Sequence, residues 1–162
     1  MVKSDNLTAE LLIKTIGFEA NKKEGNWKNG LEEVRKFIND SVGIDTATFS
    51  IQDGSGVSRY NYGSPSQYID LLKWVYNNKA IRDQFINTLP NSTPKGVLNK
   101  RSLPNKVYAK TGSLSGVTTF SGYIFTNSGE IVAFSILMNG FKGDSLPYKN
   151  LQDKIVSALS MI

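Results

Sequence analysis

A lysine, a threonine, a glycine and two serines interrupt a segment that otherwise looks like a β-strand, residues 107–124 (VYAKTGSLSGVTTFSGYI). The two-residue period of a strand puts Lys110 and Gly112 on one face and Thr111 and Ser113 on the other. A lysine supplies positive charge, a threonine supplies a hydroxyl, and a glycine lets another backbone approach closely. On an exposed sheet edge this set suits a substrate that carries a carboxylate and docks as an added strand, with the Ser113 N–H as an oxyanion-hole donor. The alternative is an edge strand whose lysine discourages aggregation.

A second polar group, Ser4-Asp5-Asn6, precedes the first apolar helical pattern of the chain. Each of these residue types can cap a helix by accepting a hydrogen bond from a backbone N–H, so capping alone explains the triplet. Taken alone, the triplet is better explained by capping than by chemistry.

The chain contains no histidine and no cysteine, which narrows the chemistry. Without histidine, Ser-His-Asp catalysis and most zinc sites are excluded. Without cysteine, thiol chemistry, disulfides and iron–sulfur clusters are excluded. Nucleophilic chemistry would then use a Ser or Thr that is activated by Lys, or else carboxylates.

Apolar residues at helical spacing predict five helices. The first would begin at Ser4-Asp5-Asn6 and end at Gly17, and its apolar residues are Leu7, Leu11, Leu12 and Ile16. Further helices fit residues 31–43, 66–77 and 79–89. The last would have Asp144 or Ser145 as its cap and Pro147 in its first turn. Its apolar face would comprise Leu151, Ile155, Ala158, Leu159 and Ile162.

Four segments have the composition of strands. These are residues 46–52, 107–113, 118–126 and 130–138. The stretch TNSGE between the last two is a hairpin signal, so that pair should be antiparallel. Residues 131–138 (IVAFSILM) are apolar on both alternations, which predicts a strand covered on both faces. Loops are expected at 53–65 and from Pro90 to Asn105. The predicted fold class is α+β, an antiparallel sheet packed by helices.

The composition fits one globular domain over residues 1–162. No apolar run approaches the roughly 20 residues of a membrane span, and Met1-Val2-Lys3 leads into a polar segment instead of a secretory signal peptide. The net charge of +5 would suit an anionic partner. The basic residues are scattered, however, without the stripe or module of a nucleic-acid-binding protein, so nucleic acid is not expected as a partner.

The stretch DGSGVSRYN, residues 53–61, has two interpretations. As a tight turn it would use Gly54 and Gly56 for unusual backbone angles. As part of a cleft, it would present Ser58 and Arg59 to a substrate. The turn is favoured, because Asx-type turns are common.

The two polar groups together, S-D-N at residues 4–6 and K-T-G at residues 110–112, match motifs of class A β-lactamases and penicillin-binding proteins. Three blocks occur in order: KSDNLTAELLIKTIG, DGSGVSRYN and AKTGSLSGVTTFSGYI. By these blocks the chain resembles the C-terminal part of D-alanyl-D-alanine carboxypeptidases of the low-molecular-mass penicillin-binding type, peptidase family S13. The resemblance spans most of the chain and is weakest between Phe18 and Asp45. It implies the C-terminal portion of the β-lactamase/DD-peptidase (transpeptidase-like) fold.

The resemblance also implies a reaction, acyl transfer from the D-Ala-D-Ala end of a peptidoglycan stem peptide through an acyl-enzyme. Ser4 would relay a proton toward the leaving amine, and Asn6 would hydrogen-bond the substrate backbone. Lys110 would lie in one pocket with Ser4, where its ammonium would support Ser4 and the substrate carboxylate electrostatically. Asp5 would serve only the helix start. The substrate would be bound by Thr111, Gly112 and Ser113. No metal or cofactor is implied. β-Lactams would bind the intact parent, which is expected in the periplasm or cell envelope of a bacterium.

The nucleophile of the family belongs to an S-x-x-K motif upstream of S-D-N, and only three residues precede Ser4 here. One literal match exists, at residues 92–95 (STPK), but it lies between Pro90 and Gly96 with no helical pattern after it. It is not expected to be the nucleophile. The chain is therefore expected to carry half of an active site, to be inactive alone and not to be acylated by penicillin. It should also expose apolar surface, which predicts a homo-oligomer.

Other functions share these features. A class A β-lactamase has both motifs but needs a glutamate base between them, and no glutamate occurs between Glu33 and Glu130. A non-catalytic peptidoglycan-binding module would use the same cleft only to hold stem peptides. The sequence also leaves open whether the parent is a carboxypeptidase, an endopeptidase or both.

Overall fold

The computed structural model describes residues 2–104 and 106–162, and it divides the chain into two compact units, residues 3–71 and 72–162. The boundary falls within helix α3 (Pro65–Asn77). Asn105, the last residue of the predicted loop, lies outside the described residues. Within the described part of the chain, no helix is long and apolar enough to cross a membrane.

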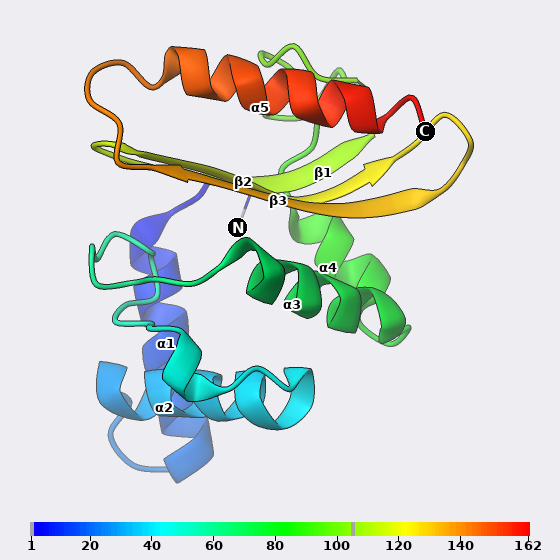
Figure 1. Cartoon of the computed structure of the whole chain (residues 1–162). Coiled ribbons are helices and arrows are strands. Elements are labelled where there is room, and N and C mark those ends of the chain that lie inside the picture. Colours follow the sequence, from blue (N-terminus) through cyan, green and yellow to red (C-terminus); the bar gives the residue numbers. More distant parts are fainter. Residues whose placement is uncertain (1, 105) are drawn as a thin grey trace. The chain divides into compact units, whose positions relative to one another are not determined.

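Two helices, α1 (Asn6–Asn21) and α2 (Trp27–Phe37), make up most of the first unit (Figure 1). They cross where glycines let the two backbones touch. A Cβ on Gly30 of α2 would lie 2.0 Å from the carbonyl oxygen of Ile13, and a Cβ on Gly17 of α1 would lie 2.7 Å from the Gly30 nitrogen. The predicted helix end at Gly17 is therefore wrong. This glycine serves the helix crossing, and α1 continues past it.

The apolar face predicted for α1 is also not the face that packs within the unit. The buried residues of the helix are Ala9, Ile13 and Gly17. Three of the four predicted residues are exposed, namely Leu7, Leu11 and Leu12. Gly17 is buried because the backbone of α2 approaches it so closely that no side chain fits there, and the Ile13 side chain packs where Gly30 of α2 leaves room for it.

The strand predicted over residues 46–52 is wrong. Thr46–Thr48 form a 3₁₀ turn, in which the Asp45 carboxylate accepts a hydrogen bond from the Ala47 N–H at 2.9 Å. Ser50 makes a single antiparallel bridge, to Tyr62. The Asp45 side chain gives the backbone an alternative to strand pairing, which the alternation of residue types does not reveal.

The second unit contains a sheet of order β1-β2-β3 within its described residues. The strands are β1 (Val107–Leu114), β2 (Val117–Phe125) and β3 (Ile131–Asn139). Both pairs are antiparallel, so the three predicted strands and the hairpin after β2 are confirmed. The outer strands β1 and β3 form the two edges of the sheet.

Helix α5 (Leu146–Leu159) covers one face of the sheet (Figure 1). The core on that face is formed by Leu98, Val107, Ala109, Phe120, Ile124, Phe134 and Val156. The opposite face packs against the end of α3 and against α4 (Arg82–Thr88), around the buried Tyr123. The Tyr123 hydroxyl donates to the Leu72 carbonyl at 2.6 Å. Because β3 contributes to both cores, the prediction that both its faces are covered is confirmed for part of the strand.

Helix α5 begins as predicted, with Ser145 at the cap and Pro147 in the first turn. Its predicted apolar face is wrong in part. Of the five predicted residues only Leu159 packs against the core, whereas Leu151, Ile155, Ala158 and Ile162 are exposed. The buried apolar residue of the helix is Val156, which was not predicted. The helix instead buries two polar residues, which hold the loop that precedes β1. Arg101 of that loop donates to Asp153 at 2.7 Å and to Gln152 at 3.1 Å.

Candidate functional site

The S-D-N triplet lies at the start of α1, and only its middle residue caps the helix. The Asp5 carboxylate accepts hydrogen bonds from the Thr8 N–H, at 2.7 Å, and from the Thr8 hydroxyl. These bonds lower the pKa of Asp5. The helix-start role predicted for Asp5 is confirmed, so the cap does not require Ser4 or Asn6, both of which are exposed.

The backbone of Ser4 is in the left-handed region, with φ of 52°. A serine adopts this conformation less readily than a glycine, and such residues are concentrated at functional sites. The turn carries Ser4 into α1 directly before the cap.

The K-T-G residues lie in β1 with the alternation that the sequence predicts. Val107 and Ala109 point into the core under α5, whereas Lys110 lies on the opposite face, in the same row as Ser121 of β2 and Ser135 of β3. The two serine hydroxyls are 2.9 Å apart and hydrogen-bonded to each other. Lys110 is therefore at the outer end of a polar row that crosses the sheet.

The Lys110 ammonium donates a hydrogen bond to the Thr111 carbonyl at 2.5 Å, toward the outer edge of β1. Partial burial lowers the pKa of Lys110. The next residue on the same face, Gly112, has no room for a side chain, because a Cβ there would lie 2.5 Å from the Thr119 hydroxyl oxygen. The glycine thus keeps this face shallow beside the lysine.

The outer edge of β1 is closed in its first half. The segment 90–92 pairs with it, through the Ala109 N–H to the Pro90 carbonyl at 2.8 Å and the Ser92 N–H to the Val107 carbonyl at 3.0 Å. Because outward-pointing residues alternate along an antiparallel strand, Thr111 and Ser113 direct their N–H and C=O groups to the same edge. The open part of the edge therefore begins beside Lys110.

Ser92, from the literal S-x-x-K match, has a structural role. Its hydroxyl donates to the Pro104 carbonyl at 2.6 Å and accepts from the Val107 N–H at 3.0 Å. The serine is buried, and residues 92–95 form no helical turn. This geometry supports the prediction that Ser92 is not a nucleophile, since its hydroxyl holds the closed edge of β1.

The structure brings the predicted residues together within each unit. Ser4 and Asn6 lie at one helix start in the first unit, and Lys110 to Ser113 lie on one strand of the second. A single pocket that contains both groups stays a prediction. Among residues 2–104 and 106–162, no cluster of three His, Cys, Asp or Glu side chains is arranged to hold a metal ion.

The loop 53–61 is a turn held by an Asp side chain, as predicted, but the prediction is wrong for Gly54, which has no positive φ and instead lies against the backbone of α1, where a Cβ would be 2.6 Å from the Ala9 carbonyl oxygen. The Asp53 carboxylate accepts from the backbone N–H of Gly56 at 2.7 Å and of Ser58 at 2.5 Å, and from the Asn61 amide at 2.8 Å. Gly56 has φ of 79°. One carboxylate thus fixes both ends of the loop.

Glu10 anchors the same loop to α1, a role that the sequence analysis missed. It accepts from the Ser55 N–H at 3.0 Å, from the Gly54 N–H at 3.1 Å and from the Trp27 indole at 2.8 Å. The hydrogen bond with Ser55, followed by those with Gly54 and Trp27, lowers the pKa of Glu10 to about 2. No local signal marks this residue, because its loop partners are more than forty positions away in the sequence.

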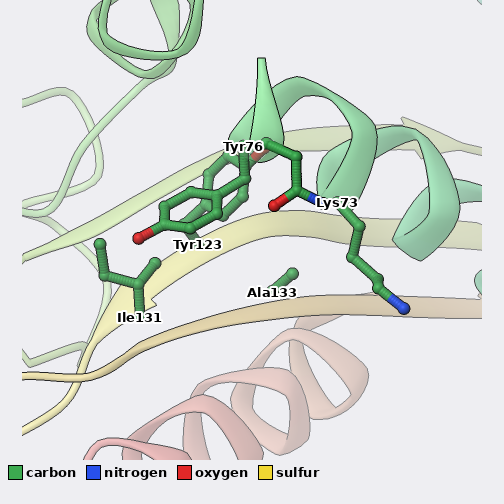
Figure 2. A pocket seen from close by; sticks show the side chains of 6 residues that line it. Lys73, Tyr76, Tyr123, Ile131 and Ala133 are labelled. Atoms are coloured by element: carbon green, nitrogen blue, oxygen red, sulfur yellow. The ribbon is translucent and has the colours of Figure 1, made fainter. Parts of the chain in front are cut away.

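A cavity of about 240 Å³ lies on the sheet face opposite α5. Figure 2 shows Lys73 and Tyr76 of α3 beside Tyr123, Ile131 and Ala133 of the sheet. Burial raises the pKa of Tyr123 to about 12. None of the predicted site residues lines this cavity.

Comparison with solved structures defines the class of protein. The crystal structure of penicillin binding protein 4 from Haemophilus influenzae, complexed with a β-lactam, matches with a TM-score of 0.85 and 28% identity, over 100% of this chain and 40% of that chain. The TLA-3 extended-spectrum β-lactamase matches with a TM-score of 0.73 and 21% identity, over 98% and 60% of the two chains. The architecture is that of the β-lactamase/DD-peptidase fold.

The family profile is more specific. The chain belongs to the D-Ala-D-Ala carboxypeptidase 3 (S13) family, whose profile matches residues 1–161. A D-alanyl-D-alanine carboxypeptidase from an Actinomadura strain is 36% identical over 153 residues, which cover 86% of this chain and 27% of that protein. The chain spans about a third of the length of the curated relatives that it matches. The predicted family and fold class are confirmed.

Proposed function

We propose that this chain supplies the peptide-binding half of a serine-type D-Ala-D-Ala carboxypeptidase that acts on peptidoglycan stem peptides. The observation that carries the proposal is the open edge of β1, which begins at Thr111 with the Lys110 ammonium beside it. An extended peptide can add to such an edge through main-chain hydrogen bonds. An ammonium at the start of the edge suits a peptide that ends in a carboxylate.

The reaction would proceed as acyl transfer. A serine of an S-x-x-K motif outside this chain attacks the carbonyl carbon of the D-Ala-D-Ala bond and gives its hydroxyl proton to the lysine of that motif, while the Ser113 N–H stabilises the oxyanion. Ser4 passes a proton to the leaving amine as the C–N bond breaks, and water then hydrolyses the ester. Asn6 and Thr111 orient the peptide backbone and its terminal carboxylate. No step needs a metal ion.

The cellular setting follows from the substrate. A peptidoglycan stem peptide is met in the periplasm or cell envelope, so the whole protein is expected to act there. Because the penicillin binding protein 4 structure contains a β-lactam, the whole protein is also expected to bind β-lactams. The whole protein would be a carboxypeptidase if it cleaves only terminal bonds, and also an endopeptidase if it cleaves the peptide cross-links of the wall. Which bonds it cleaves depends on the space beyond Ser113.

Peptide binding can be tested with this chain alone. The probe is an N-acetylated tripeptide that ends in D-Ala-D-Ala, titrated into ¹⁵N-labelled protein and followed by amide chemical shifts. Shifts at Thr111, Gly112 and Ser113 are expected, and the same peptide ending in L-Ala-L-Ala is the control. Equal shifts with both peptides, or none at these amides, would contradict the proposal. A fluorescent penicillin should leave no label after denaturation, because the acylated serine is expected outside this chain.

A further inference from the structure

Glycine follows an asparagine or an aspartate at three places in the chain, Asn29-Gly30, Asp53-Gly54 and Asn139-Gly140. In such a pair the glycine nitrogen can attack the side-chain carbonyl carbon of the preceding residue. Glycine permits this reaction because it has no Cβ to obstruct the approach of its nitrogen. The nitrogen must also be free of a hydrogen bond, so the fold decides which of the three pairs can react.

The pair Asn29-Gly30 lies at the start of α2 and is held on both sides. The Gly30 N–H donates to the Asn26 carbonyl at 3.1 Å, and the Asn29 amide donates to the Glu24 carbonyl at 3.4 Å. Gly30 is also buried at the helix crossing, where a Cβ would lie 2.0 Å from the Ile13 carbonyl oxygen. The Asn29 side chain therefore reaches the next nitrogen only if α2 opens locally.

The pair Asp53-Gly54 is held by the hydrogen bonds of its loop. The Gly54 N–H donates to the Glu10 carboxylate at 3.1 Å. The Asp53 carboxylate accepts from two backbone N–H groups and from the Asn61 amide. Both reacting groups of this pair are thus already bonded to other partners.

The pair Asn139-Gly140 differs from the other two. It lies at the end of β3, where pairing with β2 stops at Val117 and the connection to α5 begins (Figure 1). Both residues are exposed. Within residues 2–104 and 106–162, neither the Asn139 amide nor the Gly140 N–H has a hydrogen-bond partner. Gly140 has φ of 77°, and a Cβ on it would meet no atom beyond its chain neighbours within 4 Å.

We infer that Asn139 is a deamidation site, the one Asn-Gly or Asp-Gly pair that the fold leaves open to this reaction. The Gly140 nitrogen loses its proton to hydroxide and attacks the Asn139 side-chain carbonyl carbon. The new C–N bond closes a five-membered succinimide ring, the bond to the amide nitrogen breaks, and ammonia leaves with a proton from water. Water then opens the ring at either carbonyl, which leaves aspartate or isoaspartate at position 139. The reaction consumes only water and releases only ammonia.

The product changes both the charge and the backbone at this end of the sheet. Either product adds a negative charge, which lowers the formal net charge of +5. Isoaspartate also adds a carbon to the main chain between β3 and α5. This connection touches the β1–β2 turn, because a Cβ on Gly116 would lie 2.8 Å from the Phe141 carbonyl oxygen. The Phe141 ring stacks on Tyr148 of α5 with ring centres 4.0 Å apart, so the lengthened chain should disturb both contacts.

Peptide mass spectrometry of the unmodified 162-residue sequence tests the assignment without any variant. The folded chain is incubated at mildly alkaline pH, and deamidation is followed at Asn139 and Asn29 in the same sample. Asn139 should react at least roughly tenfold faster, because Asn29 must wait for local opening of α2. The rate at Asn139 should rise with pH, since the Gly140 nitrogen must lose its proton. In denaturant the two asparagines should react at similar rates, because both precede glycine.

A matched pair of variants gives a second readout. Asn139→Gln should remove the acidic species that isoelectric focusing detects in the incubated protein, because attack on the longer side chain would have to close a larger ring. Asn29→Gln should leave that species unchanged, and circular dichroism verifies that both variants are folded. Equal rates at the two asparagines of the folded chain, no deamidation at Asn139, or an acidic species that persists in Asn139→Gln would each overturn the inference.

Discussion

The Lys110 ammonium hydrogen-bonds the carbonyl oxygen of Thr111, the next residue of the same strand, at 2.5 Å. That carbonyl belongs to the open edge of β1, so the lysine occupies an acceptor that a docked strand would use. A peptide carboxylate can replace the carbonyl as the partner of the ammonium. In the proposed function, this contact would hold the ammonium beside the open edge before a peptide binds.

Replacing Lys110 tests this arrangement. Lys110→Met keeps the length of the side chain and removes the charge, and we expect it to weaken binding of the D-Ala-D-Ala tripeptide roughly 10- to 100-fold, because hydrogen bonds to charged groups contribute about 1.5–3 kcal/mol. Lys154→Met, at an exposed position of α5, changes the net charge equally and should bind normally. The measurement is an NMR titration, and equal affinities of the two variants would contradict the role of Lys110.

Glu10 should make the first unit sensitive to acid. Its pKa is lowered from 4.5 to about 2, so its hydrogen bonds contribute stability that is present above about pH 4.5 and lost as the pH falls toward 2. Glu10→Gln should lower stability at neutral pH and flatten the pH dependence in this window. Trp27 fluorescence during denaturant unfolding reports it, since its indole donates to Glu10. Glu32→Gln, at an exposed site on α2, is the control and should retain the wild-type profile.

Gly30 should be intolerant of a methyl group. In Gly30→Ala the new Cβ would lie 2.0 Å from the Ile13 carbonyl oxygen, so α1 and α2 must separate, at a cost on the order of 1–3 kcal/mol. The matched control is Gly43→Ala. There the Cβ meets nothing within 4 Å, and only the positive φ of 82° opposes the change. Denaturant unfolding should show the larger loss for Gly30→Ala, and the reverse order would contradict the close crossing.

The Arg101–Asp153 pair should hold the loop before β1 to α5. Their side chains are 16% and 9% exposed, and the guanidinium also lies 4.2 Å from the Phe120 ring centre. Removal of one partner, as in Asp153→Ala, should cost about 3–5 kcal/mol because the arginine loses its counter-charge. The double variant Arg101→Met with Asp153→Leu should recover part of that loss. Equal stability of the single and double variants would show that the two residues are not coupled.

The strands of the second unit could be predicted because turn residues separate their apolar runs. The turn residues from Thr126 to Glu130 predicted the hairpin between β2 and β3. The two-residue period predicted that Lys110 and Thr111 lie on opposite faces of the sheet. Gly17 and residues 46–52 were misassigned for a common reason. A glycine that ends a helix and one that allows a helix crossing look alike in sequence, as do a strand and a 3₁₀ turn that is held by Asp45.

The candidate site was predictable only where motifs are local. Lys110 and Ser4 could be proposed as site residues because K-T-G and S-D-N are short contiguous patterns. Glu10 was missed because it acts on the backbone of a loop distant in sequence, and backbone donors carry no residue signature. The same holds for the segment 90–92, whose pairing with β1 decides where the open edge begins.

The pairing of residues 90–92 with β1 blocks one end of the open edge of that strand. A peptide that runs antiparallel to β1 places its C-terminus toward Ala109, where the Pro90 carbonyl already occupies the Ala109 N–H. It can extend freely in the other direction only, past Ser113. In the proposed function this blocked end would set where a bound peptide terminates, so that the backbone would contribute to selection for chain ends in addition to the Lys110 ammonium.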